Sequence, residues 1–242
     1  MDKAYSVFVN AAAIVLVPSI VRDAAVDDLM NSVLLAQLVA NKNLQRIPNA
    51  DWYGSYMDVL RVAWISGAKR RKDLLPKQEG TSSPLEWVAE IPLDDRPDQQ
   101  QQIMAVLDRV AALPGSLPAL SILRKHMQKH NEPDPPQSPS SSSPVRLLVI
   151  VAHSPVSMTG ICLQFNTGKS IDANPWRQGF DGKDIDGCVS ARYVRMQLSE
   201  TLFAPARDVI ARKVAAFVGD NIADITKAID DSDVLPAEEV CR

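Results

Sequence analysis

Residues 21–42 contain a stretch that is apolar on almost every side of a helix, and it restricts the fold more than any other feature. From Leu29 to Ala40, the only polar residues are Asn31, Ser32 and Gln37. A helix that is apolar nearly all round is buried in the interior of a protein. Aspartates crowd its start and a lysine ends it, which is the order of charge that the helix dipole favours. The sequence therefore predicts a central buried helix around which the other elements pack.

The composition favours a globular protein and argues against several classes. Aliphatic and aromatic residues make up 46% of the chain, enough for a sizeable core. The net charge of −3 provides no basic field for nucleic acids, so we expect no nucleic-acid partner. Cys162, Cys188 and Cys241 fit neither a disulfide framework nor a zinc spacing. Free thiols are typical of a reducing compartment, so we predict a soluble, cytoplasmic protein without a cofactor.

The N-terminal residues 4–21 carry no charge. Such a run is compatible with the apolar part of a secretory signal or with a membrane helix. Asp2 argues against a positively charged leader, and Asn10 and Pro18 interrupt a membrane span. A buried strand or short helix is therefore the favoured interpretation, and a cleaved leader on a secreted protein is the alternative.

Residues 131–144 hold five prolines and five serines in fourteen positions. This composition predicts a disordered, flexible loop, because it can neither build a core nor sustain a helix. Helical patterns dominate before it and strand patterns after it. Residues 85–91 alternate like a strand, and a lone strand would leave its backbone groups unpaired, so its partners are expected beyond the loop. We predict one α+β domain over residues 1–242, with a helical cluster on a small, mostly antiparallel sheet.

The other segments show the periodicity of four further helices and several strands. The expected helices cover residues 51–66, 97–113, 119–130 and 202–229. The expected strands cover residues 5–9, 14–17, 85–91, 146–153, 160–166 and 189–198, the last of which also fits a helix. Gly67 is expected to end the second helix, which places the basic residues 69–72 in an exposed turn beyond it. Contact of these basic residues with phosphates or anionic lipid is the alternative.

His126 and His130 are spaced to lie on one face of a helix. Zinc could use such a pair together with a third ligand, which makes these two residues the candidate metal ligands. No glutamate follows His126 as a metalloprotease helix requires, and basic residues surround the pair. Solvation at the end of a helix is therefore the favoured interpretation.

His153 ends the apolar run at residues 146–153. The carboxyl end of a buried strand is where α/β enzymes place catalytic groups. Four aspartates follow in a stretch rich in turn residues: Asp172, Asp181, Asp184 and Asp186. A metal-assisted hydrolase or nuclease would use His153 with these carboxylates, and His153, Asp184 and Asp186 are the candidate catalytic residues. The alternative is a histidine bonded to the backbone, beside a solvated loop.

The chain has no phosphate loop, dinucleotide fingerprint or nucleophile elbow. We therefore predict a non-catalytic binding or interaction protein, such as a toxin- or defence-like effector that meets a protein partner or a membrane, or forms a homo-oligomer. The hydrolase or nuclease is the second hypothesis, and the sequence leaves open whether the protein is an enzyme.

Overall fold

The computed structural model describes residues 5–19, 24–47, 50–77, 79–128 and 142–232. The strands are β1 (Tyr5–Asn10), β2 (Ala13–Pro18), β3 (Trp64–Leu74), β4 (Ser143–Ser154), β5 (Ser157–Thr167), β6 (Ile185–Leu198) and β7 (Ile222–Asp224). The helices are α1 (Ala24–Arg46), α2 (Trp52–Leu60), α3 (Pro84–Ala89), α4 (Pro97–Ala112), α5 (Pro118–Met127), α6 (Glu200–Phe203), α7 (Arg207–Asn221) and α8 (Thr226–Ser232), with a short 3-10 helix η1 (Pro175–Arg177).

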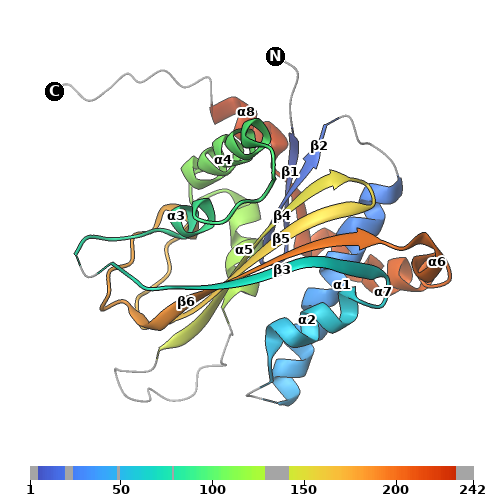
Figure 1. Cartoon of the computed structure of the whole chain (residues 1–242), viewed down its shortest axis with the longest axis horizontal. Coiled ribbons are helices and arrows are strands. Elements are labelled where there is room, and N and C mark those ends of the chain that lie inside the picture. The colour runs from blue at the N-terminus through green and yellow to red at the C-terminus, as the bar shows by residue number, and fades with distance from the viewer. Residues whose placement is uncertain (1–4, 20–23, 48–49, 78, 129–141, 233–242) are drawn as a thin grey trace.

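The seven strands form one sheet in the order β3-β6-β5-β4-β2-β1-β7 (Figure 1). Strands β2 and β4 are parallel, and every other neighbouring pair is antiparallel. The predicted α+β class and the mostly antiparallel sheet are therefore confirmed, although the sheet is larger than expected. It combines strands from before and after the proline- and serine-rich stretch, most of which lies outside the described residues. Ser143 and Pro144 already belong to β4.

The two faces of the sheet carry different helices. Helix α2 covers one face, where its side chains meet β4, β5 and β6 in a tightly packed layer. On the opposite face, Trp87 of α3 contacts Phe165 of β5 and Phe180, with ring centroids 5.2 and 5.7 Å away. Because side chains alternate along a strand, the residues of β4 divide between these two environments. Two polar residues of β4, Arg146 and His153, therefore lie in different surroundings.

Helix α1 is the buried helix that the sequence predicts. Its buried apolar residues are Leu29, Met30, Val33, Leu34, Ala36 and Ala40. The helix contacts α2, α7 and β1. Its Gln37 is fully buried: the side-chain amide donates to the Asn10 carbonyl at 2.8 Å and accepts from the Ala12 backbone N–H at 2.9 Å. A polar residue of the central helix thus completes the hydrogen bonds of the β1–β2 turn, where Ala11 has a positive φ of 52°.

The apolar N-terminal segment forms the hairpin of β1 and β2, which lies inside the sheet. The interpretation of this segment as a strand is therefore confirmed over the described residues. None of the helices in the described part of the chain combines the length and apolar character that a membrane crossing requires.

Three expectations for individual elements are wrong. Residues 85–91 do not form a strand, because α3 occupies most of them. The helix expected over residues 51–66 ends at Leu60, and Gly67 lies within β3 rather than at a helix end. The helix expected over residues 202–229 is divided into α6, α7 and α8, because Ile222–Asp224 pairs with β1 as strand β7.

Helix α3 begins with a capping box that explains why a helix replaces the expected strand. The Ser83 hydroxyl accepts from the Glu86 backbone N–H at 3.3 Å, and the Glu86 carboxylate accepts from the Ser83 backbone N–H at 2.8 Å. Pro84 follows at the first helical position, where its missing N–H costs nothing. Local capping therefore outweighs the strand-like alternation of residues 85–91.

We expect Ser83→Ala to lower the free energy of unfolding by about 1 kcal/mol, because one backbone donor at the start of α3 loses its acceptor. Urea denaturation of both proteins measures this difference. Ser83→Asp is the matched control, since aspartate also accepts at this position and is expected to retain the stability. An equal loss in both variants would show that the cap does not stabilise the helix.

Candidate functional site

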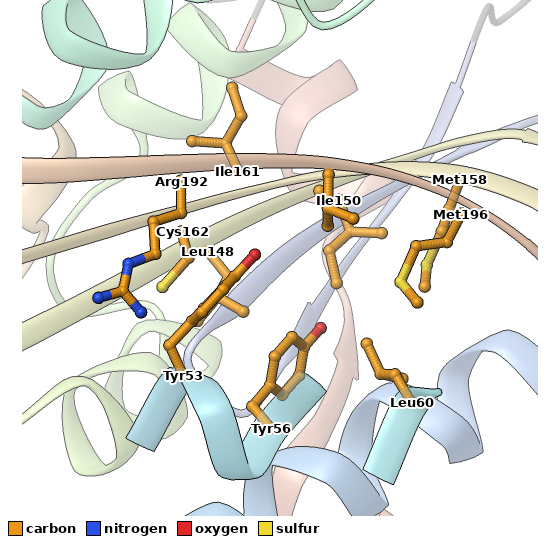
Figure 2. A pocket seen from close by; sticks show the side chains of 12 residues that line it. Tyr53, Tyr56, Leu60, Leu148, Ile150, Met158, Ile161, Cys162, Arg192 and Met196 are labelled. Atoms are coloured by element: carbon orange, nitrogen blue, oxygen red, sulfur yellow. The ribbon is translucent and has the colours of Figure 1, made fainter. Parts of the chain in front are cut away.

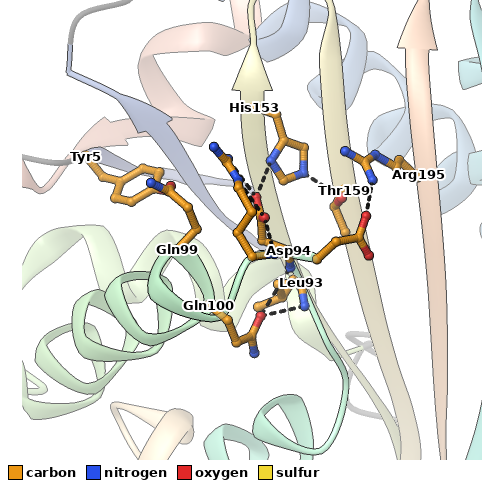
Figure 3. A network of polar contacts seen from close by, with 10 residues as sticks. Tyr5, Leu93, Asp94, Gln99, Gln100, His153, Thr159 and Arg195 are labelled. Atoms are coloured by element: carbon orange, nitrogen blue, oxygen red, sulfur yellow. Dashed lines mark hydrogen bonds and ion pairs between the residues drawn. The ribbon is translucent and has the colours of Figure 1, made fainter.

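His153, the histidine outside the predicted metal pair, lies in a buried polar network (Figure 3). Its Nδ1 is 3.1 Å from Oδ2 of Asp94, and its Nε2 is 2.7 Å from Oγ1 of Thr159. Asp94 also accepts from the backbone and guanidinium of Arg96. The side chains of Asp94 and His153 are only 5% and 12% exposed. A neutral imidazole that carries its proton on Nδ1 satisfies both contacts, by donating to Asp94 and accepting from Thr159.

Burial controls the protonation of this network. It lowers the pKa of His153, and the nearby Asp94 carboxylate only partly opposes this effect. For Asp94, burial alone would raise the pKa, but the hydrogen bonds from Arg96, together with His153, outweigh it, so the pKa lies below its usual value. A neutral histidine beside an ionised aspartate is therefore the favoured state at neutral pH.

The structure does not bring His153 together with the aspartates expected to assist it. His153 lies at the end of β4, whereas Asp184 lies beside Thr167 at the far end of the β4–β5 hairpin. Ten residues of antiparallel strand separate these ends by about 30 Å. Asp184 instead pairs with Lys169 at 2.7 Å, and Asp186 accepts from the Ser142 hydroxyl at 3.3 Å. The catalytic roles of His153, Asp184 and Asp186 stay predictions that this arrangement does not support.

The other two aspartates of that stretch are also engaged locally. The Asp181 carboxylate accepts from the backbone N–H groups of Lys183 and Asp184, at 2.7 and 3.1 Å. The backbone N–H of Asp172 donates to Gln178 at 2.9 Å. Such contacts are those of an ordered turn.

Only one member of the predicted metal pair can be placed. His126 lies on α5, with its Nδ1 3.5 Å from the side-chain nitrogen of Asn41 on α1, and His130 lies outside the described residues. Asn41 in turn accepts from the indole N–H of Trp52 at 2.7 Å. Over the described ranges, no three histidine, cysteine or carboxylate residues are grouped so that they could hold a metal ion.

Four exposed apolar side chains belong to segments at the end of the sheet where β3 begins and β6 ends, which we call the apolar end. Figure 1 shows where these segments lie. The side chains come from four separate segments: Val62 in the α2–β3 turn (60% exposed), Ile65 in β3 (58%), Leu202 in α6 (51%) and Val156 in the β4–β5 turn (38%). Backbone hydrogen bonds join these segments, since the N–H of Leu198 donates to Val156 and that of Ser199 donates to Ala63, at 2.8 and 2.9 Å. Several exposed apolar residues in neighbouring segments are characteristic of an interaction surface.

The basic residues Lys69, Arg70, Arg71 and Lys72 lie on β3 and not in a turn after a helix, which corrects the sequence expectation. All four are exposed, and within the described part of the chain β3 pairs with β6 alone, so it forms an edge of the sheet. Lysine and arginine on an edge strand discourage pairing with other strands. They also place a positive band next to the apolar end, about 13 Å along the strand from Ile65 to Lys69. Residues 64–65 lie within the helix expected over residues 51–66, although an aromatic residue followed by a β-branched one favours a strand and is the one local signal for β3.

Comparisons with known proteins do not assign the chain to a family. No family model matches the sequence, and no curated protein matches it significantly. One solved structure, described as a delta-endotoxin, superposes with a TM-score of 0.40 and 9% sequence identity, over 78% of this chain and 81% of the other. A TM-score of this size does not establish a shared fold.

Proposed function

We propose that the protein is a non-catalytic binding protein, a toxin- or defence-like effector that docks on an anionic membrane surface through its apolar end. The observation that carries this proposal is the group of exposed Val62, Ile65, Val156 and Leu202 at one end of the sheet. The basic strand β3 beside this group supplies charge that complements anionic head groups.

The size of the apolar end favours a lipid surface over a protein partner. Four side chains form a patch smaller than the area that a stable protein–protein interface buries. Half-exposed aliphatic side chains gain about 1 kcal/mol each on leaving water, which sums to about 4 kcal/mol, or millimolar affinity. Apolar contact alone is therefore weak, and the basic residues of β3 have to contribute. Binding should then require anionic lipid and should weaken with salt.

Vesicle flotation tests this proposal with the full-length protein. We expect it to bind vesicles of phosphatidylcholine mixed with phosphatidylserine, and to bind pure phosphatidylcholine poorly. The double variant Val62→Asp/Ile65→Asp should bind the anionic vesicles more than about tenfold more weakly, because it loses apolar contact and gains negative charge. Ile47→Asp is the matched control, since Ile47 is equally exposed but lies beyond the other end of α2, and it should bind normally.

The vesicle experiment also separates the proposal from its alternatives. An equal loss of binding in the Ile47→Asp protein would mean that the apolar end has no special role. Absence of binding to either vesicle would contradict the membrane proposal. If the unmodified protein is instead a dimer that Val62→Asp/Ile65→Asp converts to a monomer, the apolar end is an interface between copies of the chain.

A further inference from the structure

A groove lies on the α2 side of the sheet, away from the apolar end. This groove has a volume of about 630 Å³, within the range of small-molecule sites. It is bordered by the start of α2, and Arg71, Arg146 and Arg192 are among its lining residues. Arg192 lies six positions before Leu198 on β6, and Leu198 pairs with the first residue of β3. Arg192 is therefore about 20 Å along the strand from the apolar end.

The register of the strands explains why three arginines share this groove. Arg192 on β6 lies directly opposite Arg71 on β3. Arg146 on β4 lies opposite Gln164 on β5, which lies opposite Ser190 on β6, two residues before Arg192. Residues that are directly opposite, or two apart along a strand, point to the same face. Since like charges directly opposite one another are destabilising, this arrangement favours a bound anion.

Arg146 is the residue that points most directly to a ligand. It is only 4% exposed, yet over the described residues its guanidinium makes no hydrogen bond or ion pair. Its contact is with the ring of Trp52, 5.4 Å from the guanidinium carbon to the ring centroid. An unpaired buried charge is costly, and arginines are buried mostly when they are paired. The two other arginines have carboxylates nearby: Arg71 bonds Asp73 at 3.0 Å, and Arg192 lies 3.6 Å from Asp51.

Two further donors in the same groove lack acceptors. The hydroxyl oxygen of Ser190 is buried and has no hydrogen-bond partner among the residues that the structure describes. Helix α2 begins at Trp52 beside the groove, and over the described residues no side chain hydrogen-bonds its first N–H groups, although the carboxylate of the N-cap residue Asp51 also lines the groove. An anion in the groove would accept from the Ser190 hydroxyl and gain from the positive end of the helix dipole.

The neighbouring cavity under α2 does not serve as the anion site. It holds only about 10 Å³ and is lined almost entirely by apolar side chains (Figure 2). Burial raises the pKa of Tyr53 to about 12 and that of the Cys162 thiol to about 12, as expected where negative charge is disfavoured. In Figure 2, the guanidinium of Arg192 points away from Tyr56 and the methionines of this cavity.

We propose that the groove at Arg146 and Arg192 binds the phosphate group of a small soluble molecule. Guanidinium groups from two strands, the Ser190 hydroxyl and the start of α2 offer donors from several directions, which suits a tetrahedral oxyanion with several acceptor oxygens. A carboxylate, with two oxygens in one plane, would satisfy fewer of these donors. Arg71 belongs both to the basic strand β3 and to the groove, but Arg146 and Arg192 belong to the groove alone, so variants of these two residues test this proposal separately from the membrane proposal.

Calorimetric titration with inorganic phosphate, in the absence of lipid, tests the proposal on the full-length protein. We expect saturable binding at one site, stronger at pH 8, where inorganic phosphate is mostly the dianion, than at pH 5.5, where it is mostly the monoanion. Acetate at equal ionic strength should bind at least tenfold more weakly. Equal binding of acetate and phosphate would overturn the assignment of a phosphate group.

Arg146→Met and Arg192→Gln should each weaken phosphate binding at least tenfold. In phosphate-free buffer, Arg146→Met should melt at the same or a higher temperature, because methionine fills the space on Trp52 without an unpaired charge. A lower melting temperature would indicate a structural role for Arg146 instead. Arg70→Gln is the matched control, because Arg70 precedes Arg71 on β3 but faces the other side and lies 5.7 Å from the Tyr193 ring. Equal weakening in Arg70→Gln would show an adventitious ion only.

Discussion

Replacing Gln37 with leucine is expected to lower the free energy of unfolding by about 2–6 kcal/mol. The Gln37 side chain satisfies two buried backbone groups of the β1–β2 turn, the Ala12 N–H at 2.9 Å and the Asn10 carbonyl at 2.8 Å. Leucine has a similar volume but leaves both groups without partners, and each unpaired buried group costs about 1–3 kcal/mol. The loss is expected although the substitution makes α1 more apolar.

Urea denaturation of Gln37→Leu measures this loss. Gln101→Leu is the matched control, because Gln101 is an exposed residue of α4 and its substitution should change stability by less than about 0.5 kcal/mol. Gln37→Glu provides a second check, since a carboxylate keeps the acceptor for Ala12 but cannot donate to Asn10. If Gln37→Leu were as stable as the control, the turn would not depend on the helix for its hydrogen bonds.

Hydrophobic patterns predicted the parts of the fold that are buried on all sides. The continuous apolar run at residues 146–153 became the centre of β4, and the apolar stretch of residues 29–40 became the middle of α1. Burial on all sides leaves a strong trace in sequence, because nearly every position must be apolar. The role of Gln37 could not be predicted in this way, because it depends on a hairpin that lies more than twenty residues earlier.

The failed predictions concern elements whose structure depends on short local signals or distant partners. Residues 85–91 alternate like a strand, yet the Ser83-x-x-Glu86 capping box and Pro84 were visible signals for a helix. Strand β7 left no comparable signal, because Ile222–Asp224 continues a helical pattern and becomes a strand only by pairing with β1. Strand β3 is exposed over most of its length, so its sequence lacks alternating apolar residues.

The candidate sites were less predictable than the fold. His153 was identified as a strand-end histidine, but its partner Asp94 is 59 positions earlier, in a segment where no motif marks it. Arg146 begins an apolar strand and gave no sign of a site, because its significance depends on Arg192 and Ser190 being brought beside it by strand pairing. Residues that converge through sheet register carry no fixed spacing in sequence, so motif searches do not find them.

Replacing Asp94 with asparagine is expected to lower the free energy of unfolding by about 1.5–3 kcal/mol at pH 7, because charged hydrogen bonds from Arg96 and His153 are lost. The loss should depend on pH. The folded-state pKa of Asp94 is depressed, so its contribution is full above the ordinary value of about 3.9 and disappears as the pH falls through the folded-state pKa. The folded-state pKa of His153 is also depressed, so the unfolded chain takes up more protons below about pH 6.5 and stability falls with acid.

Because the Asp94 charge raises the pKa of His153, removing it should lower that pKa further. The stability difference between the unmodified protein and Asp94→Asn should therefore widen as the pH falls through the folded-state pKa of His153, which is depressed below its ordinary value, and narrow again as Asp94 itself is protonated. Urea denaturation across this range measures the difference, and NMR titration measures the pKa of His153, with His153→Gln to assign its signal. Asp95→Asn is the matched control, since Asp95 is the neighbouring residue but is 77% exposed in its pair with Arg195. A constant difference at every pH would contradict coupling between Asp94 and His153.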